Sequence, residues 1–197
     1  MLRTFVMMGV SGSGKSCIGA KLAHALGGVF EDADDFHPQS NIEKMAHGVP
    51  LTDSDRWPWL HSLRQQIILY RRIADYYVLS CSALKQCYRD TLRGNDSTDT
   101  LHFVYLKGTP DLLRQRMEAR QHFMPSTLLE SQLAILEEPQ EALIVDIRTA
   151  PDQIVRVILD SVRSMEVTQA VAPKSLHLKK LHPQKLHPKK PHQKNLL

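Results

Sequence analysis

The chain has 197 residues, of which 42% are hydrophobic and 23% charged, with three cysteines and a net charge of +4. This length suggests a single domain with its own core. No run of 18 apolar residues occurs, which argues against a membrane span, and the N-terminus lacks a signal-peptide pattern. Few cysteines without zinc-site spacing favour a reducing, cytoplasmic environment.

The positive charge is concentrated at the C-terminus. Residues 168–197 contain seven lysines and no acidic residue, so residues 1–167 carry a net charge of −3. Histidine recurs there at positions 177, 182, 187 and 192. A five-residue period fits neither helix nor strand, which predicts a disordered Lys/His/Pro-rich tail; metal capture or weak polyanion binding by this tail are the alternatives. We expect a folded domain at 1–167 with no nucleic-acid partner of its own.

Strand-like and helix-like segments alternate along this domain, which is typical of an α/β fold with a parallel sheet. Apolar, β-prone runs predict strands at 4–8, 28–31, 76–81, 101–106 and 142–147. Helical periodicity predicts helices at 15–26, 39–47, 56–74, 84–93, 110–120, 126–137 and 151–165.

The most specific motif follows the first predicted strand and leads into the first helix. It reads Gly9, Val10, Ser11, Gly12, Ser13, Gly14, Lys15 and Ser16, and it fits the pattern G-x-x-x-x-G-K-[ST]. Backbone N–H groups of such a loop cradle phosphates, and the following helix adds its positive N-terminal end. The lysine reaches the β- and γ-phosphates, and the Ser16 hydroxyl can bind Mg²⁺. We therefore predict an ATP-binding loop.

An acidic segment follows the second predicted strand, at the sheet edge where ligands bind in such folds. The strand at 76–81 lacks a terminal aspartate, so Asp32 and Asp34 are the candidates for the metal-side carboxylate. Asp34 could also hold the hydroxyl of an acceptor. Arg116 and Arg120 could offset charge on the transferred phosphoryl group, and 121–125 is a candidate lid.

At these residues the chain resembles the small, phosphate-loop gluconokinases. The resemblance spans about residues 3–165 and rests on motifs in the segments 32–38, 41–51, 53–60, 81–90, 105–108, 122–125, 129–132, 136–139 and 145–147. It implies a three-layer phosphate-loop kinase fold, related to shikimate and nucleoside-monophosphate kinases, with a five-stranded parallel sheet, a helical substrate-binding insert and a short lid.

The resemblance implies transfer of the ATP γ-phosphate to the 6-hydroxyl of D-gluconate, with Mg²⁺, in a cytoplasmic homodimer. It points to Lys15, Asp34 and Arg120 as catalytic residues, and to Ser16 and Asp32 on the metal side. The gluconate carboxylate calls for arginine, with Arg56 and Arg89 as candidates. The remaining substrate candidates are Asp34, His37, Lys85 and His122. A kinase for another small acceptor, or a nucleotide-binding switch with a basic tail, are the competing hypotheses.

Overall fold

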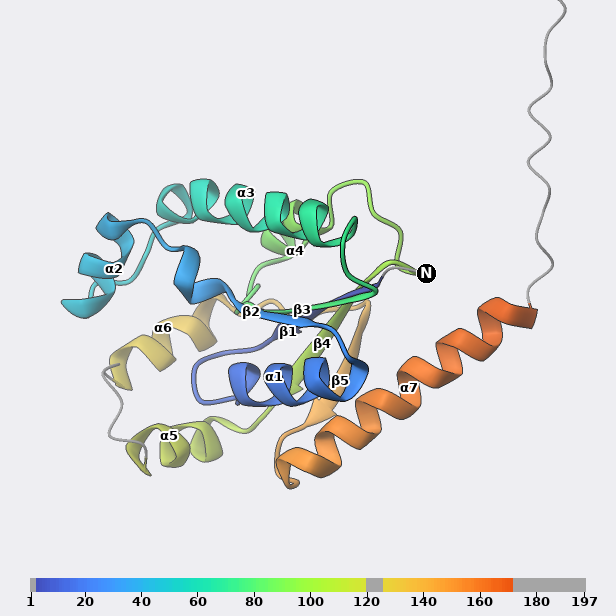
Figure 1. The fold of residues 1–197 in the computed structure, drawn as a ribbon. Coiled ribbons are helices and arrows are strands. Elements are labelled where there is room, and N and C mark those ends of the chain that lie inside the picture. Colours follow the sequence, from blue (N-terminus) through green and yellow to red (C-terminus); the bar gives the residue numbers. More distant parts are fainter. Residues whose placement is uncertain (1–2, 120–125, 172–197) are drawn as a thin grey trace, which may run out of the picture.

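The computed structural model describes residues 3–119 and 126–171, and the structural statements below concern these residues. Five parallel strands form one sheet in the order β2-β3-β1-β4-β5 (Figure 1). The strands are β1 (Arg3–Met8), β2 (Val29–Asp32), β3 (Tyr76–Ser80), β4 (Leu101–Lys107) and β5 (Ala142–Asp146). The predicted α/β fold with a five-stranded parallel sheet is confirmed.

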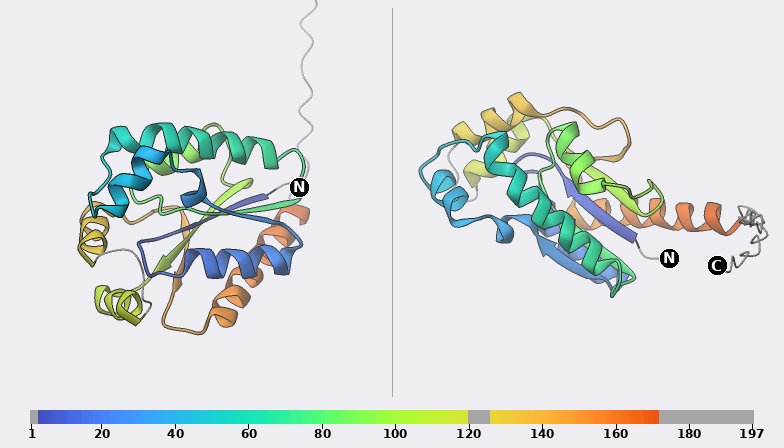
Figure 2. Two further views of the ribbon diagram at one scale, coloured as in Figure 1. Left: turned by 60° about the vertical axis from the view of Figure 1, so that its left-hand side comes forward. Right: turned by 90° about the horizontal axis from the view of Figure 1, so that it is seen from above.

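Helices cover both faces of the sheet (Figures 1 and 2). Helices α1 (Lys15–Leu26) and α7 (Pro151–Val171) lie on one face, and α3 (Asp53–Tyr70) and α4 (Gln86–Arg93) lie on the other. Within the described ranges, no helix has both the length and the apolar character that crossing a membrane requires.

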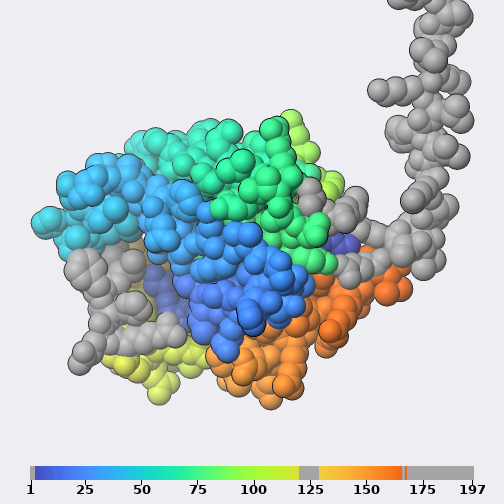
Figure 3. Space-filling model, viewed as in Figure 1, coloured from blue at the N-terminus to red at the C-terminus, as the bar shows by residue number. Residues whose placement is uncertain are grey.

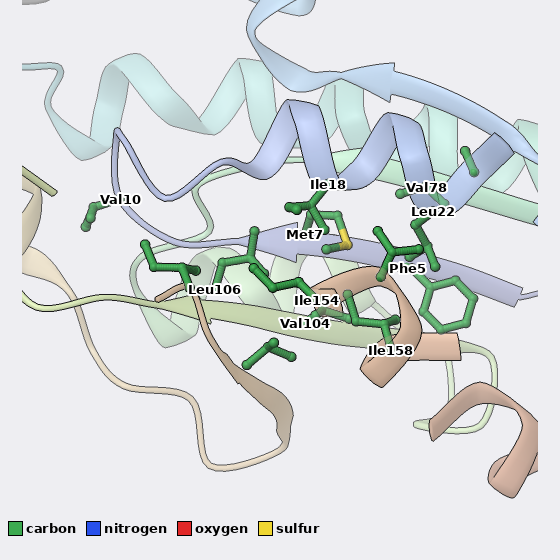
Figure 4. Close-up of a cluster of buried hydrophobic side chains, with 14 of the residues drawn as sticks. Phe5, Met7, Val10, Ile18, Leu22, Val78, Val104, Leu106, Ile154 and Ile158 are labelled. Atoms are coloured by element: carbon green, nitrogen blue, oxygen red, sulfur yellow. The ribbon is translucent and has the colours of Figure 1, made fainter. Parts of the chain in front are cut away.

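The core is divided into two layers by the sheet, as the alternation of β1 side chains illustrates. Phe5 and Met7 belong to the buried cluster beneath α1 and α7, which Figure 4 shows. Val6 and Met8 belong to the cluster beneath α3 and α4. Successive side chains of a strand point to opposite faces, and a strand covered on both faces is therefore a nearly continuous apolar run.

Three further helices lie at the end of the molecule where the strands have their carboxyl ends (Figure 2). These are α2 (Gln39–Ala46), α5 (Pro110–Ala119) and α6 (Ser126–Ile135). Helix α7 extends away from them, towards the lower right of the surface in Figure 3. The carboxyl end of the sheet is therefore the end with elements available to build a binding site.

Helix boundaries differ from the sequence-based expectation at several points. Helix α3 begins three residues early because Thr52 and Asp55 form a reciprocal capping box at its start. The acidic segment forms a short 3-10 helix, η1 (Ala33–Phe36), which periodicity did not predict. Helix α7 continues to Val171, so the first residues of the predicted tail, 168–171, are helical.

Candidate active site

The glycine-rich loop connects β1 to α1 at the centre of the sheet. Gly9 and Gly12 have φ angles of 141° and 81°, a region that glycine enters freely. A Cβ on Gly9 would lie 2.9 Å from the carbonyl oxygen of Leu106, and one on Gly12 would lie 3.1 Å from that of Leu113. These glycines therefore permit both the turn and its close packing on β4 and α5.

Lys15 is the first residue of α1, and its side chain folds back over the loop. Its Nζ donates a hydrogen bond to the carbonyl oxygen of Val10 at 3.1 Å. Burial lowers the pKa of Lys15, while the charges of Asp34 and Asp32 act in the opposite direction. The lysine and the two predicted carboxylates thus lie within electrostatic reach of one another.

The two aspartates differ in their surroundings. Asp32 ends β2, and its Oδ1 accepts a hydrogen bond from the backbone N–H of Asp34 at 3.2 Å, which caps η1. The Asp34 side chain remains 74% exposed but stands in a recess. Loss of surrounding water there, together with the charge of Asp32, raises the pKa of Asp34, and Lys15 partly offsets this. A carboxylate with a raised pKa is suited to accepting a proton.

Oxygen atoms that could hold a divalent cation lie near the end of β3, where Asp32 is the register partner of Ser80. The Ser16 hydroxyl is 3.4 Å from the Ser80 hydroxyl, at the end of β3. Among the described residues, no group of three or more His, Cys, Asp or Glu is placed to hold a metal. Mg²⁺ bound with phosphates takes only one or two protein carboxylates. Ser16 and Asp32 therefore fit a cation that binds together with the nucleotide.

A pocket next to the loop brings five predicted site residues together. Ser11, Lys15, Asp34, His37 and Arg56 all line it. The rest of its wall consists of Met45, Pro50, Leu51, Trp59, Ser82, Ser131 and Gln132. The pocket combines cationic, acidic and neutral polar groups from segments that are far apart in the sequence.

His37 is held as a neutral ring in this pocket. It stacks on Trp59, with ring centroids 4.2 Å apart and an interplanar angle of 13°, and its side chain is only 4% exposed. Trp59 is itself fixed, since its Nε1 donates to the carbonyl oxygen of Ala33 at 2.7 Å. Burial, and secondarily the charge of Arg56, lowers the pKa of His37 to about 4. At neutral pH the ring can donate one hydrogen bond and accept another.

Arg56 and Lys85, both predicted to bind substrate, occupy different positions. Arg56 lines the pocket, and its Nη1 donates to the carbonyl oxygen of Leu51 at 2.6 Å. Lys85 does not line the pocket; its Nζ donates to both carboxylate oxygens of Asp53, at 2.8 Å each. The structure thus places Lys85 as the partner of the Asp53 carboxylate, and neither residue lines the pocket.

Arg89, the other arginine predicted to bind the substrate carboxylate, does not line the pocket. This arginine is only 3% exposed, and its Nη1 donates to the carbonyl oxygens of Ala83 and Leu84, at 2.9 and 3.0 Å. Ala83 has a φ of 45°, which costs energy for a residue with a Cβ. Arg89 therefore supports the turn that follows β3, and its guanidinium is directed into the protein rather than into the pocket.

Gln132 is a pocket residue that the sequence reasoning did not single out. Its Oε1 accepts a hydrogen bond from the backbone N–H of Ser11 at 2.7 Å, which joins α6 to the phosphate loop. The only signal was its place in the 129–132 motif, because an uncharged amide has no distinctive spacing. Arg120 and His122 lie outside the described residues, as does the predicted lid.

A second recess, of about 260 Å³, lies on the other side of the loop. Its walls include Gly14 of the loop, Cys17 and Arg116, with Thr149 and Ile154 from the segment that enters α7. Arg116 donates from Nη2 to the carbonyl oxygen of Ile147 at 2.6 Å. The loop thus separates a pocket rich in ionisable groups from a recess that is mostly apolar.

The chain is similar to curated gluconokinases, although no protein-family model matches it. It is 42% identical over 179 residues to the probable gluconokinase of Xenopus tropicalis, covering 83% of this chain and 89% of the relative. It is 41% identical over 164 residues to the thermoresistant gluconokinase of Escherichia coli (strain K12), covering 81% and 93%.

Solved structures give the same result. A gluconokinase from Sinorhizobium meliloti 1021 superposes with a TM-score of 0.77 at 42% identity, covering 86% of this chain and 97% of that chain. Shikimate kinase from Aquifex aeolicus vf5 superposes with a TM-score of 0.54 at 16% identity, covering 83% and 98%. The second likeness concerns the fold alone, which is that of phosphate-loop kinases.

Proposed function

The chain belongs to the gluconokinase family, and we propose that the phosphate loop and the pocket next to it are the donor and acceptor halves of its active site. The reaction is the ATP-dependent phosphorylation of D-gluconate at the 6-hydroxyl, which gives 6-phospho-D-gluconate and ADP. The acceptor oxygen bonds to the γ-phosphorus, the bond from that phosphorus to the β–γ bridging oxygen breaks, and the hydroxyl loses its proton. The observation that carries these roles is that Lys15, Asp34, His37 and Arg56 line one pocket.

On the donor side, the N–H groups of residues 9–16 and the Nζ of Lys15 hold the ATP phosphates. The purine ring occupies the recess lined by Cys17, Arg116 and Thr149, since that recess adjoins the loop and is mostly apolar. Ser16 and Asp32 would hold Mg²⁺, which would supply positive charge to offset that of the β- and γ-phosphates. Lys15 gives up its hydrogen bond to the Val10 carbonyl oxygen and binds the β- and γ-phosphate oxygens instead.

On the acceptor side, Arg56 binds the carboxylate of gluconate, because a guanidinium matches a carboxylate with two parallel hydrogen bonds. His37 contacts hydroxyl groups as a neutral ring. Asp34 accepts the proton of the 6-hydroxyl, a role that its raised pKa favours. In the 120–125 segment, Arg120 offsets charge on the transferred phosphoryl group and His122 contacts the acceptor.

The test is a coupled assay of ADP release with gluconate, compared with shikimate, other sugar acids and nucleoside monophosphates. We expect release that depends on gluconate and on Mg²⁺, with Mn²⁺ as the alternative cation. The control is Lys15→Met, which we expect to be inactive because the lysine contacts the reacting phosphate. Folded, ATP-binding protein without gluconate-dependent release would contradict the proposal.

Four broader expectations accompany this function. The kinase domain is 1–167 and the tail is an appendage, so a chain ending at Val171, the last residue of α7, should keep its kinase activity. A homodimer is expected from the family resemblance and can be tested by sedimentation. A cytoplasmic location is supported by the three free cysteines, and the domain is expected to bind no nucleic acid.

A further inference from the structure

Tyr88, on α4, connects Arg56 to the partly exposed ion pair of Asp53 and Lys85. The Tyr88 side chain is among the largest that are fully enclosed, with the residue 2% exposed. Its hydroxyl donates to Oδ1 of Asp53 at 2.6 Å, and Nη1 of Arg56 donates to the same hydroxyl at 3.3 Å. Lys85 holds Asp53 from the other side through both carboxylate oxygens. The four residues therefore form a chain that runs from Lys85 to the pocket.

The direction of each hydrogen bond in this chain is fixed by chemistry. The hydrogen bonds from Lys85 and Tyr88 lower the pKa of Asp53, which therefore stays ionised and can only accept. Burial and the adjacent carboxylate raise the pKa of Tyr88, so the phenol keeps its one proton. Because that proton goes to Asp53, the phenol oxygen must accept from Arg56.

The consequence concerns which edge of the Arg56 guanidinium remains available. Nη1 carries two hydrogens, and its two acceptors are the Leu51 carbonyl oxygen and the Tyr88 hydroxyl. Among the described residues, Nε and Nη2 have no hydrogen-bond partner. These two groups form one edge of the planar fork, and a carboxylate can bind that edge with two parallel bonds.

We propose that Tyr88, held by Asp53 and Lys85, is a positioning residue that turns the Nε–Nη2 edge of Arg56 to the carboxylate of the acceptor. The inference rests on the proposed function, since it requires an acceptor with a carboxylate at Arg56. It also gives Lys85 a role, because Lys85 acts on substrate binding through Asp53 and Tyr88 without contacting the substrate. Selectivity for a sugar acid thus depends on Tyr88, Asp53 and Lys85 in addition to Arg56. Of these three, Tyr88 is wholly buried.

Contacts with the Tyr88 ring keep the hydrogen-bonded side chains in place when the Tyr88 hydroxyl alone is removed. The Arg56 guanidinium carbon lies 5.7 Å from the centre of the Tyr88 ring, and the Lys85 ammonium lies 5.6 Å from it. Trp57 packs against the ring edge-on, at 5.7 Å and 84°. A Tyr88→Phe variant retains the ring and these contacts, so it tests the hydroxyl without leaving a cavity.

The experiment measures kcat and KM for gluconate and for ATP in Tyr88→Phe. We expect KM for gluconate to rise about 10-fold, the size of one hydrogen bond to a charged group, with kcat and KM for ATP changed less than about 3-fold. The matched control is Tyr70→Phe, which removes a 2.8 Å phenol–carboxylate bond to Glu31 outside the pocket. It should leave all three parameters at the wild-type values.

A second pair of variants shows whether Tyr88 acts through Arg56. In an Arg56→Met background, Tyr88→Phe should add less than a 2-fold change in KM for gluconate, because coupled residues are not additive. An unchanged KM in folded Tyr88→Phe, or the same 10-fold rise in both backgrounds, would overturn the inference while leaving the gluconokinase reaction intact. Absence of gluconate-dependent ADP release from the wild type would instead remove the proposed function itself.

Discussion

Replacing Asp34 by asparagine should remove proton transfer while leaving the fold and ATP binding in place. Two contacts and the size of the new side chain define the expected effect. The hydrogen bond that caps η1 uses the backbone N–H of Asp34, so it survives the substitution. Nε2 of His37 is 3.9 Å from Oδ1 of Asp34, beyond hydrogen-bond range. Asparagine matches aspartate in size, so the change removes a charge and no packing.

The size of the loss follows from the role proposed for the carboxylate. A positioned general base contributes about 10²–10⁴-fold to a rate, equivalent to about 3–5 kcal/mol of transition-state stabilisation. We expect kcat of Asp34→Asn to fall within that range, with the affinity for ATP changed less than about 3-fold. Lys15 loses the largest of the charges that favour its ammonium form, but its phosphate contacts are unaffected.

The pH dependence provides an independent check. Asp34 must be ionised to accept a proton, and its pKa is raised. Wild-type kcat should therefore decline, as pH falls, at a higher pH than an ordinary aspartate would give, and this limb should be absent in Asp34→Asn. The control is Asp35→Asn, which removes an exposed carboxylate of the same turn that does not line the pocket. A coupled ADP assay giving kcat of Asp34→Asn within about 5-fold of wild type would refute this reasoning.

Three further substitutions test other parts of the site. Gly12→Ala should abolish most ATP binding, because its Cβ would lie 3.1 Å from a backbone carbonyl at a φ of 81°. The control is Gly27→Ala, where φ is 66° but the space around the residue is open; it should cost about 1 kcal/mol of stability and no activity. His37→Gln should reduce the loss of folding free energy that occurs as the pH falls from 7 to 5. The folded pKa of His37, about 4, lies below its unfolded value of 6.5, so the unfolded chain binds the proton first and the wild type loses about 2 kcal/mol between pH 7 and 5 through this group. Gln132→Met should lower kcat/KM about 5-fold, because it removes the hydrogen bond to the Ser11 N–H.

Each of these has a clear contrary outcome. If ATP titrations gave the same affinity for Gly12→Ala and Gly27→Ala, the close packing around Gly12 would have no effect on ATP binding. Urea unfolding at pH 5 and 7 would count against a buried neutral His37 if the variant and the wild type lost equal stability. Wild-type kcat/KM in Gln132→Met would mean that its hydrogen bond to the phosphate loop has no part in the reaction.

Much of the fold could be predicted because its signals are local. β1 is buried at every position and apolar from Phe5 to Met8, as expected for a strand covered on both faces. Each predicted strand overlaps an observed one. Helix boundaries were less certain, since they depend on caps. The Thr52–Asp55 capping box moves the start of α3, and Asp32 caps an unpredicted turn at Asp34.

The candidate site was predicted less evenly, and Arg56 and Arg89 illustrate why. Both are arginines in segments that carry the family resemblance, and the sequence offered no basis for choosing between them as the carboxylate ligand. In the structure, Arg56 lines the pocket, whereas Arg89 bonds to the carbonyl oxygens of the turn after β3. Lys85 likewise pairs with Asp53, thirty-two positions earlier in the chain.

The sequence by itself determined the phosphate loop, because glycine conformation, the lysine and the helix start are set within eight consecutive residues. It also determined the α/β architecture, through the periodicity of apolar residues. Only the tertiary structure decided which charged side chains line the pocket next to the loop. That choice depends on how α3 packs on α4, which places Tyr88 between Arg56 and Asp53. The spacing of residues along the sequence does not predict such contacts, because the partners are distant in sequence. In addition, an arginine or a lysine can either line a pocket or hold other groups of the protein in place.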